Sequence, residues 1–435
     1  MSDATLFPLS ESHGKSSSLA PLGVARYQRV DRHQVRMLMM DLNSLIPEDH
    51  RVRAVWAFVE RLDLSALYAR IRAVKGGAGR SPIDPKILLA LWLYATVDGV
   101  GSARSLEEHC EKDSAYRWLC GGVGVNYHTL SDFRTAHEAV LDDLLTQSVA
   151  SLMSQDLVDL NRVAQDGMRV RAHAGAASYR REKSLQKCLE EAREQVTHLR
   201  QELEQDPGAA SRRERAARER AARERYERVE EALRQMPAAQ ARKKTEEKKE
   251  EARVSTTDPE APRMKMADGG FRPAYNVELA TETKAQVIVG ADVTNVGSDH
   301  GQMPPMVEQI EERHSCTPGE VLVDGGFAKK EDIEAVTAKG CTVYAPVQKP
   351  KKKERDPYVP REGDSKAVAA WRIRMGTEEA KTIYKERAST AECVNAAARN
   401  LGMRQFLVRG LRKVRCVVLL FALAHNMMRM IALTG

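Results

Sequence analysis

The chain has 435 residues, enough for a sizeable core and two or three domains, and carries a formal net charge of +7 from 68 basic and 61 acidic residues. Its seven cysteines form no CxxC pair and have no nearby histidine, which argues against a disulfide framework or a zinc site and fits a reducing, cytoplasmic compartment.

The first part of the chain predicts a tail followed by helices. Residues 1–34 are polar and rich in Ser, Pro and Gly, lack the features of a secretory signal, and predict a flexible tail. Residues 35–155 predict an all-helical N-terminal domain that binds DNA. Apolar or amphipathic segments occur at residues 52–62, 84–95, 105–112 and 138–153. The Asp84-Pro85 pair is typical of a helix start, because proline costs least in the first turn.

The segment at residues 127–137, YHTLSDFRTAH, is a candidate for contact with DNA. Thr129 and Ser131 are placed just before a helix that carries Arg134, and this helix is a candidate for the second helix of a DNA-binding helical motif. The alternative is a packed helix with an ordinary cap, which the local sequence alone favours.

Residues 178–254 change character and become dense in Arg, Glu, Lys, Gln and Ala. The only strong breaker is Asp206-Pro207-Gly208, so we expect two long helices folded into an antiparallel hairpin. A narrow apolar stripe on the first helix is typical of a coiled-coil seam. It consists of Leu185, Leu189, Val196, Leu199 and Leu203. A solvated spacer and a surface that pairs with another subunit or with DNA are equally weighted alternatives.

The remaining segments predict a mixed α/β layer around one sheet. Residues 163–170 form its first strand, and residues 273–294 predict a β-hairpin turning at residues 282–284. A helix at residues 303–314, a strand at 320–324, a helix at 330–339, a strand at 341–346 and a final helix follow. The apolar run at residues 417–423 in that helix is too short to span a bilayer, which needs about 20 apolar residues, so we interpret it as a core helix. The fold class is therefore α+β, with residues 156–435 as one domain interrupted by the insertion at residues 178–254.

Three acidic residues lie in distinctive settings within this second domain. Asp166 lies in the first strand, Asp324 ends a strand before Gly325-Gly326, and Glu392 lies on a predicted helix. Three carboxylates brought together by a fold are the usual means of holding two divalent metal ions for phosphodiester chemistry. Taken singly, each acid has a structural explanation as a turn residue or a solvated helix residue. Together they favour a site.

Basic residues are concentrated late in the chain. One group lies in a loop and another follows Glu392; the members are Lys349, Lys351, Lys352, Lys353, Arg355, Arg399, Arg404, Arg409, Arg412, Lys413 and Arg415. Each run alone is more simply a solvated face. Their proximity to the acids favours a phosphate backbone as the partner.

The order of DGMRVRA, DGGFRPAYNV, VLVDGGF and YKERASTAE resembles the bacterial insertion-sequence DDE transposases, close to the insertion-sequence 1182 group. The resemblance covers roughly residues 35–430. Its start, RSPIDPKILLALWLYATVDGVGSARSLEEHCEKDSAYRWLCGG, is similar to an InsH-type N-terminal domain, and RQFLVRGLRKVRCVVLLFALAHNMMRM is similar to the group's C-terminal helix.

The resemblance implies an RNase H-like catalytic domain in which Asp166, Asp324 and Glu392 are catalytic and bind two Mg²⁺ ions, with Mn²⁺ as a substitute. It implies that Tyr384 and Arg387 contact DNA phosphates, together with Arg399, which replaces the family's lysine and changes the geometry of that contact. Arg134, Lys351, Lys352 and Lys353 complete the predicted DNA-binding residues. The stretch CVNAAARN after Glu392 departs from the residues usual there.

The activity implied by the resemblance is metal-dependent cleavage and strand transfer of insertion-sequence DNA ends. The expected partners are double-stranded DNA, as terminal inverted repeats and target, and a second copy of the chain on DNA, with no membrane. The expected location is the cytoplasm, at the nucleoid when DNA is bound. Two alternatives stay open: a non-catalytic DNA-binding protein derived from a transposase, and a metal-dependent DNA nuclease without strand transfer.

Overall fold

The computed structural model describes residues 33, 39–73, 81–205, 211–243, 245–348 and 356–434. Nearly all of the predicted tail at residues 1–34, the predicted break at Asp206-Pro207-Gly208, and Lys351, Lys352 and Lys353 lie outside the described residues. Leu42–Gly435 form one compact unit.

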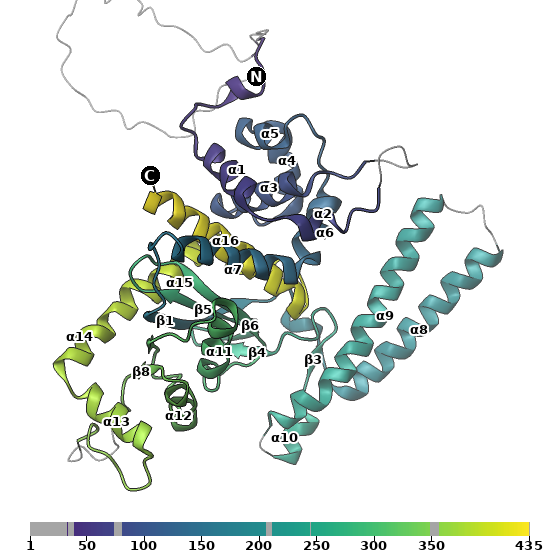
Figure 1. Ribbon diagram of the computed structural model, residues 1–435. Helices are drawn as coiled ribbons and strands as arrows, with labels where there is room; N and C mark the ends of the chain where they lie inside the picture. The colour runs from purple at the N-terminus through teal and green to yellow at the C-terminus, as the bar shows by residue number, and fades with distance from the viewer. Residues whose placement is uncertain are drawn as a thin grey trace, which may run out of the picture. The chain divides into compact units, whose positions relative to one another are not determined.

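The predicted N-terminal helices are confirmed (Figure 1). They are α1 (Arg51–Arg61), α2 (Ser65–Tyr68), α3 (Pro85–Val97), α4 (Ala103–Lys112), α5 (Ser114–Cys120), α6 (Tyr127–Ala136) and α7 (Glu138–Met153), with a 3₁₀ turn η1 at Asn43–Leu45. Asp84 caps α3 by accepting a hydrogen bond from the Lys86 backbone N–H at 2.9 Å. The placement of Thr129 and Ser131 before a helix was wrong: Asn126 caps α6, so both residues lie inside it.

A six-stranded mixed sheet forms the centre of the second half of the chain. Its strands are β1 (Arg162–Arg171), β4 (Arg263–Lys265), β5 (Phe271–Glu282), β6 (Ile288–Thr294), β7 (Glu320–Leu322) and β8 (Thr342–Tyr344). β1 is central because it pairs antiparallel with β5 and parallel with β7. β8 extends the sheet beside β7, while β4 and β6 both pair with β5.

The charged segment forms α8 (Glu182–Gln205), α9 (Arg212–Ala241) and α10 (Glu246–Glu250), between β1 and β5 in the chain. Two short strands, β2 (Tyr179–Arg180) and β3 (Val254–Ser255), pair at its base, next to a 3₁₀ turn η2 at Ala176–Ser178. α8 and α9 pack on each other, and Leu185 of the predicted stripe is fully buried beside Ala232 and Met236 of α9. At least part of the apolar stripe therefore packs against the other helix of the same hairpin.

The other helices flank the sheet. They are α11 (Met303–His314), α12 (Lys330–Ala338), α13 (Lys366–Met375), α14 (Glu378–Arg387), the π turn η3 (Ala388–Glu392), α15 (Cys393–Asn400) and α16 (Leu411–Thr434). The predicted strand at residues 320–324 ends at Leu322, so Asp324 lies two residues beyond it.

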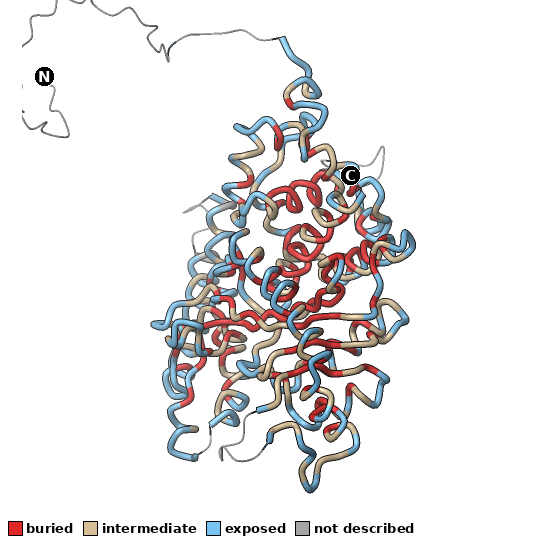
Figure 2. The backbone as a smooth tube through the Cα atoms, turned by 90° about the vertical axis from the view of Figure 1, so that its left-hand side faces the viewer, coloured by how far each residue is buried: buried red, intermediate tan, exposed pale blue. Residues whose placement is uncertain are grey.

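α16 is the only helix among the described residues that is long and apolar enough to cross a membrane. It packs against α3, α6, α7 and β6, and most of its apolar side chains are buried, so here it is the core helix that the sequence predicts (Figure 2). Its Asn426 is fully buried and forms two hydrogen bonds with the backbone of Ile288 in β6. The amide oxygen accepts from the Ile288 N–H and the amide nitrogen donates to the Ile288 carbonyl, both at 2.8 Å.

Two hydrophobic clusters lie against the sheet. The larger joins the N-terminal helices, α16 and sheet residues such as Met168 and Val277. The smaller packs Val321 and Leu322 of β7 against Phe327 and Trp371. The helical region and the sheet thus share one core, and the predicted boundary between residues 155 and 156 stays a prediction.

Candidate active site

Asp166 is the first acid of the site and lies in the middle of β1. In the second half of the strand, the buried Met168 and Val170 alternate with Arg169 and Arg171, the pattern of a strand with one face in the core. Both carboxylate oxygens have donors: Oδ1 accepts from the Gly167 N–H at 3.0 Å, and Oδ2 accepts from the Asn395 side chain at 2.9 Å. Burial raises the pKa of Asp166, and the nearby Asp324 raises it further. A cation is therefore favoured beside this carboxylate.

Asp324 lies in the turn that follows β7, and β7 is the strand that pairs parallel with β1. Its Oδ1 accepts from the Gly326 N–H at 2.7 Å, which orients the carboxylate in a tight turn. A side chain at Gly326 would collide with this oxygen, at 2.9 Å from the added Cβ, and would lie 3.1 Å from Oδ2 of Asp299. A side chain at position 326 would therefore displace the Asp324 carboxylate, and the same turn has a further acid, Asp299, beside it.

Glu392 reaches the site through an irregular helix. It ends the π turn that joins α14 to α15, and its side chain is more than half exposed. Arg387, at the end of α14, is paired with Glu392 at 2.9 Å and with Asp166 at 3.0 Å. π turns are frequent at functional sites because they alter which side chains share a face.

Arg387 lies between two of the three acids and is buried. Burial acts to lower the pKa of its guanidinium, but the carboxylates, Asp166 foremost, raise it on balance. In this arrangement Arg387 supplies the positive charge that compensates Asp166. Arg387 thus has Asp166 and Glu392 as ion-pair partners and Asp324 as a further charged neighbour, and the catalytic role of the three acids stays a prediction.

The other predicted DNA contacts are placed differently. Tyr384 lies one turn before Arg387, and burial raises its pKa, with Arg387 and the acids as its charged neighbours. Arg399 is exposed at the end of α15. Arg134 is only 7% exposed, donates to the Gly101 carbonyl, and lies 4.6 Å over the ring of Trp92. Contact between Arg134 and DNA stays a prediction, and it requires this side chain to leave its packed position.

Several polar residues near the acids are not among the site residues predicted from the sequence. Asn395 is one helical turn after Glu392, and this three-residue spacing was the available signal. Asp299, in the loop after β6, accepts from the Asn276 amide at 3.0 Å. Glu278 of β5 accepts from Asn276 at 2.7 Å and from Gln165 at 3.1 Å. Burial raises the pKa of Glu278 to about 8.

The donor chemistry of the three acids fits a divalent metal, since Mg²⁺ and Mn²⁺ prefer carboxylate oxygens. Within the part of the chain that the structure describes, however, no group of three His, Cys, Asp or Glu side chains is arranged to hold a metal ion. Instead, the guanidinium of Arg387 forms ion pairs with both Asp166 and Glu392.

Comparison with protein families gives two matches. Residues 40–136 match a transposase domain described as DUF772, and residues 240–427 match a transposase DDE domain. The second match contains Asp324 and Glu392, while Asp166 lies between the two matched segments. No curated protein matches the chain. No solved structure matches it either.

The helical N-terminal region and the mixed sheet carrying the three acids are compatible with the RNase H-like class of DNA-processing proteins. The chain belongs to the insertion-sequence DDE transposases. DNA is the substrate of this family, and its members in general use a divalent metal. Membership of the insertion-sequence 1182 group stays a prediction.

Proposed function

We propose that this protein cleaves the DNA ends of its insertion sequence and joins them to target DNA, with Asp166, Asp324 and Glu392 as the catalytic acids. The observation that carries the proposal is the convergence of these acids on Arg387 from β1, the turn after β7 and the π turn. Three carboxylates from distant parts of the chain repel one another at one partly open site, and a single guanidinium compensates this repulsion only in part, which favours a functional over a purely structural arrangement.

The acids would hold two Mg²⁺ ions, with Mn²⁺ as a substitute. When bound, such ions activate a water or a 3′-OH as nucleophile and stabilise the leaving oxygen. Asn395 and the Gly167 N–H keep the Asp166 carboxylate oriented. Arg387, released from the acids, would bind a DNA phosphate together with Tyr384 and Arg399, because a guanidinium suits a phosphate as well as a carboxylate.

The test incubates purified protein with Mg²⁺ and DNA that carries the ends of its own genomic locus. Wild type is compared with Asp324→Asn, and the matched control is Asp268→Asn, which removes an exposed acid engaged only with its own turn and Arg272. We expect 3′-end cleavage and joining by wild type and the control, and neither by Asp324→Asn, with DNA affinity retained in all three.

The products separate the alternatives. Joined molecules establish strand transfer, whereas nicks or breaks without joining indicate a nuclease. Tight binding with no metal-dependent cleavage indicates a non-catalytic DNA-binding protein. Equal loss of binding and cleavage in Asp324→Asn contradicts the role given to that residue. The same proposal expects two copies of the chain on paired ends, in the cytoplasm and at the nucleoid.

A further inference from the structure

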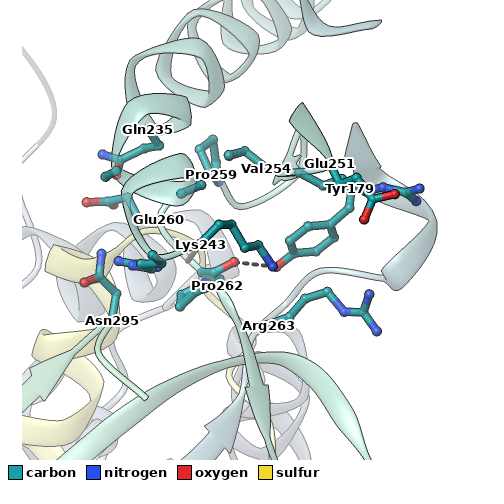
Figure 3. Close-up of a pocket in the computed structure, with 15 residues that line it drawn as sticks. Tyr179, Gln235, Lys243, Glu251, Val254, Pro259, Glu260, Pro262, Arg263 and Asn295 are labelled. Carbon is teal, nitrogen blue, oxygen red and sulfur yellow. Dashed lines mark hydrogen bonds between the residues drawn. The ribbon is translucent and has the colours of Figure 1, made fainter. Parts of the chain in front are cut away.

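A cavity of about 270 Å³ lies at the base of the helical hairpin (Figure 3). Its walls come from the end of α9, the segment from β3 to β4, and Asn295 just after β6. Tyr179 is buried at the edge of the cavity, where its hydroxyl donates to the Ala261 carbonyl. This contact ties β2 to the segment before β4, so the walls are held in place by the fold.

Four basic side chains line this cavity: Arg242, Lys243, Arg253 and Arg263. All four are exposed. Within the described residues, none of them forms an ion pair. Their charges are therefore available to a ligand.

Several other arginines of the hairpin differ in having ion-pair partners. They are paired with glutamates on the same helix or across to the other one. The paired arginines of α9 are Arg223, Arg225, Arg228 and Arg234. These stretches of the hairpin are charge-balanced, whereas four cations without ion pairs in the described part of the chain gather around one cavity at its base.

The acids at the cavity do not neutralise these cations. Only Glu251 and Glu260 line it. Glu251 is paired with Arg181 at 3.7 Å, and Glu260 accepts from the Leu411 backbone N–H at 2.8 Å. Four cations against two acids that have other partners give the cavity a positive balance. An anion is the ligand that this balance favours.

A short physical link joins the cavity to the candidate active site. Arg169 of β1 donates to the Lys265 carbonyl at 3.2 Å and to the Gly297 carbonyl at 2.9 Å, and it is paired with Asp299 at 3.7 Å. Asn295, at the cavity, is four residues before Asp299. That stretch of chain spans at most about 14 Å. The separation between Asn295 and Asp299 is thus no more than about four base-pair steps of 3.4 Å along DNA, and Asp299 lies beside the turn of Asp324.

We propose that this cavity binds a backbone phosphate of the same DNA end that the active site engages, within about four base steps of the cleaved bond. The inference rests on the proposed function and assigns the base of the inserted hairpin to holding the DNA end. Arginine and lysine at the cavity suit phosphate oxygens by charge and by hydrogen-bond donation. Such a contact carries no sequence information and fixes the position of the DNA on the protein.

The experiment measures DNA binding by fluorescence anisotropy, without metal, on duplexes carrying the end of the protein's own locus. The test variant replaces Arg242, Lys243, Arg253 and Arg263 with Gln. The control variant replaces four exposed cations elsewhere on the hairpin, namely Lys183, Lys187, Arg218 and Arg220, with Gln. Both variants lose the same charge, and thermal melting verifies that both are folded. The single variant Arg263→Gln is measured as well, so that the proposal can still be tested if the fourfold variant does not fold.

Single methylphosphonate linkages, which remove one phosphate charge, locate the contact. The slope of log affinity against log salt is negative, and we expect its magnitude to fall by about one unit or more in the test variant, as for a lost phosphate contact. The control variant should leave this slope nearly unchanged. Wild type should lose about threefold or more in affinity when a linkage within about four steps of the cleaved bond is neutralised. The test variant should not respond to that linkage.

Equal losses in the test and control variants, or equal responses of wild type and the test variant to every linkage, overturn the proposal. Its failure is distinguishable from failure of the proposed function. If wild type binds and cleaves its DNA ends and the cavity variant binds them as well as the control does, only the phosphate site is rejected. If wild type neither binds nor cleaves those ends, the proposed function is rejected first, and the phosphate site with it.

Discussion

Arg387 and Glu392 are five positions apart in the chain, yet Nη1 of the arginine lies 2.9 Å from Oε1 of the glutamate. In a regular α-helix, residues five apart point about 140° away from each other. The π turn at Ala388–Glu392 widens the helix and brings the two side chains onto one face. The local irregularity thus places the third acid near the other two.

Deleting Ser389 should therefore abolish cleavage. The shorter segment can continue as a regular helix, and residues after the deletion rotate by about 100°, the turn per residue of an α-helix. Metal-dependent nicking of the DNA ends, measured beside DNA affinity, is the readout. The control Ser389→Ala removes only an exposed hydroxyl bonded to the Glu386 carbonyl and should retain activity. Full activity in the deletion variant would show that the π turn is dispensable.

Asn395→Ala should slow cleavage by about 10- to 100-fold, the usual effect of removing a group that orients a metal ligand. The amide donates to Oδ2 of Asp166, and its loss leaves that carboxylate less fixed. The Mn²⁺ concentration needed for half-maximal nicking should rise, which a purely structural defect would not cause. The control is Asn400→Ala, at an exposed position of the same helix. An unchanged Mn²⁺ requirement would count against an orienting role.

Glu278 makes stability depend on pH. Burial raises its pKa from 4.5 to about 8 in the folded protein, so between these values the folded state keeps a proton that the unfolded state has lost. The contribution of this proton to the free energy of unfolding is fully present below pH 4.5 and is lost as pH rises to about 8. The free energy of unfolding falls by at most about 1.4 kcal/mol per pH unit over this range. Glu278→Gln, which cannot ionise, should melt with a weaker pH dependence than wild type. Parallel melting curves from pH 5 to 8.5 for the two proteins would refute this.

Asn426→Leu should lower the free energy of unfolding by at least about 2 kcal/mol, because it leaves the N–H and carbonyl of Ile288 buried without partners. Chemical denaturation measures the effect. Asn400→Leu, at an exposed position, should change stability by no more than about 0.5 kcal/mol. Similar small changes in both variants would mean that α16 does not pack on β6 as described.

Sequence patterns were sufficient for most of the secondary structure, and the three acids that they single out stay a prediction as catalytic residues. α11 was predicted at its observed bounds, because its apolar periodicity and proline-rich start are local signals. Asp166 and Asp324 were also identifiable locally, from apolar strands and following glycines. The predicted start of α6 is wrong because the cap is Asn126, one residue before the segment at residues 127–137.

What the sequence by itself determined about this protein is the order of its helices and strands, the charged helical insertion, and the family to which the chain belongs. Only the tertiary structure decided that Arg387 lies between Asp166 and Glu392, that Asn395 orients Asp166, and that Arg134 packs on Trp92. The reason is physical: periodicity and caps act within a few residues, whereas these partners are set by which strands and helices pack together. Strand pairing and burial across more than 200 residues of chain, as between Asp166 and Asn395, leave no local trace in the sequence.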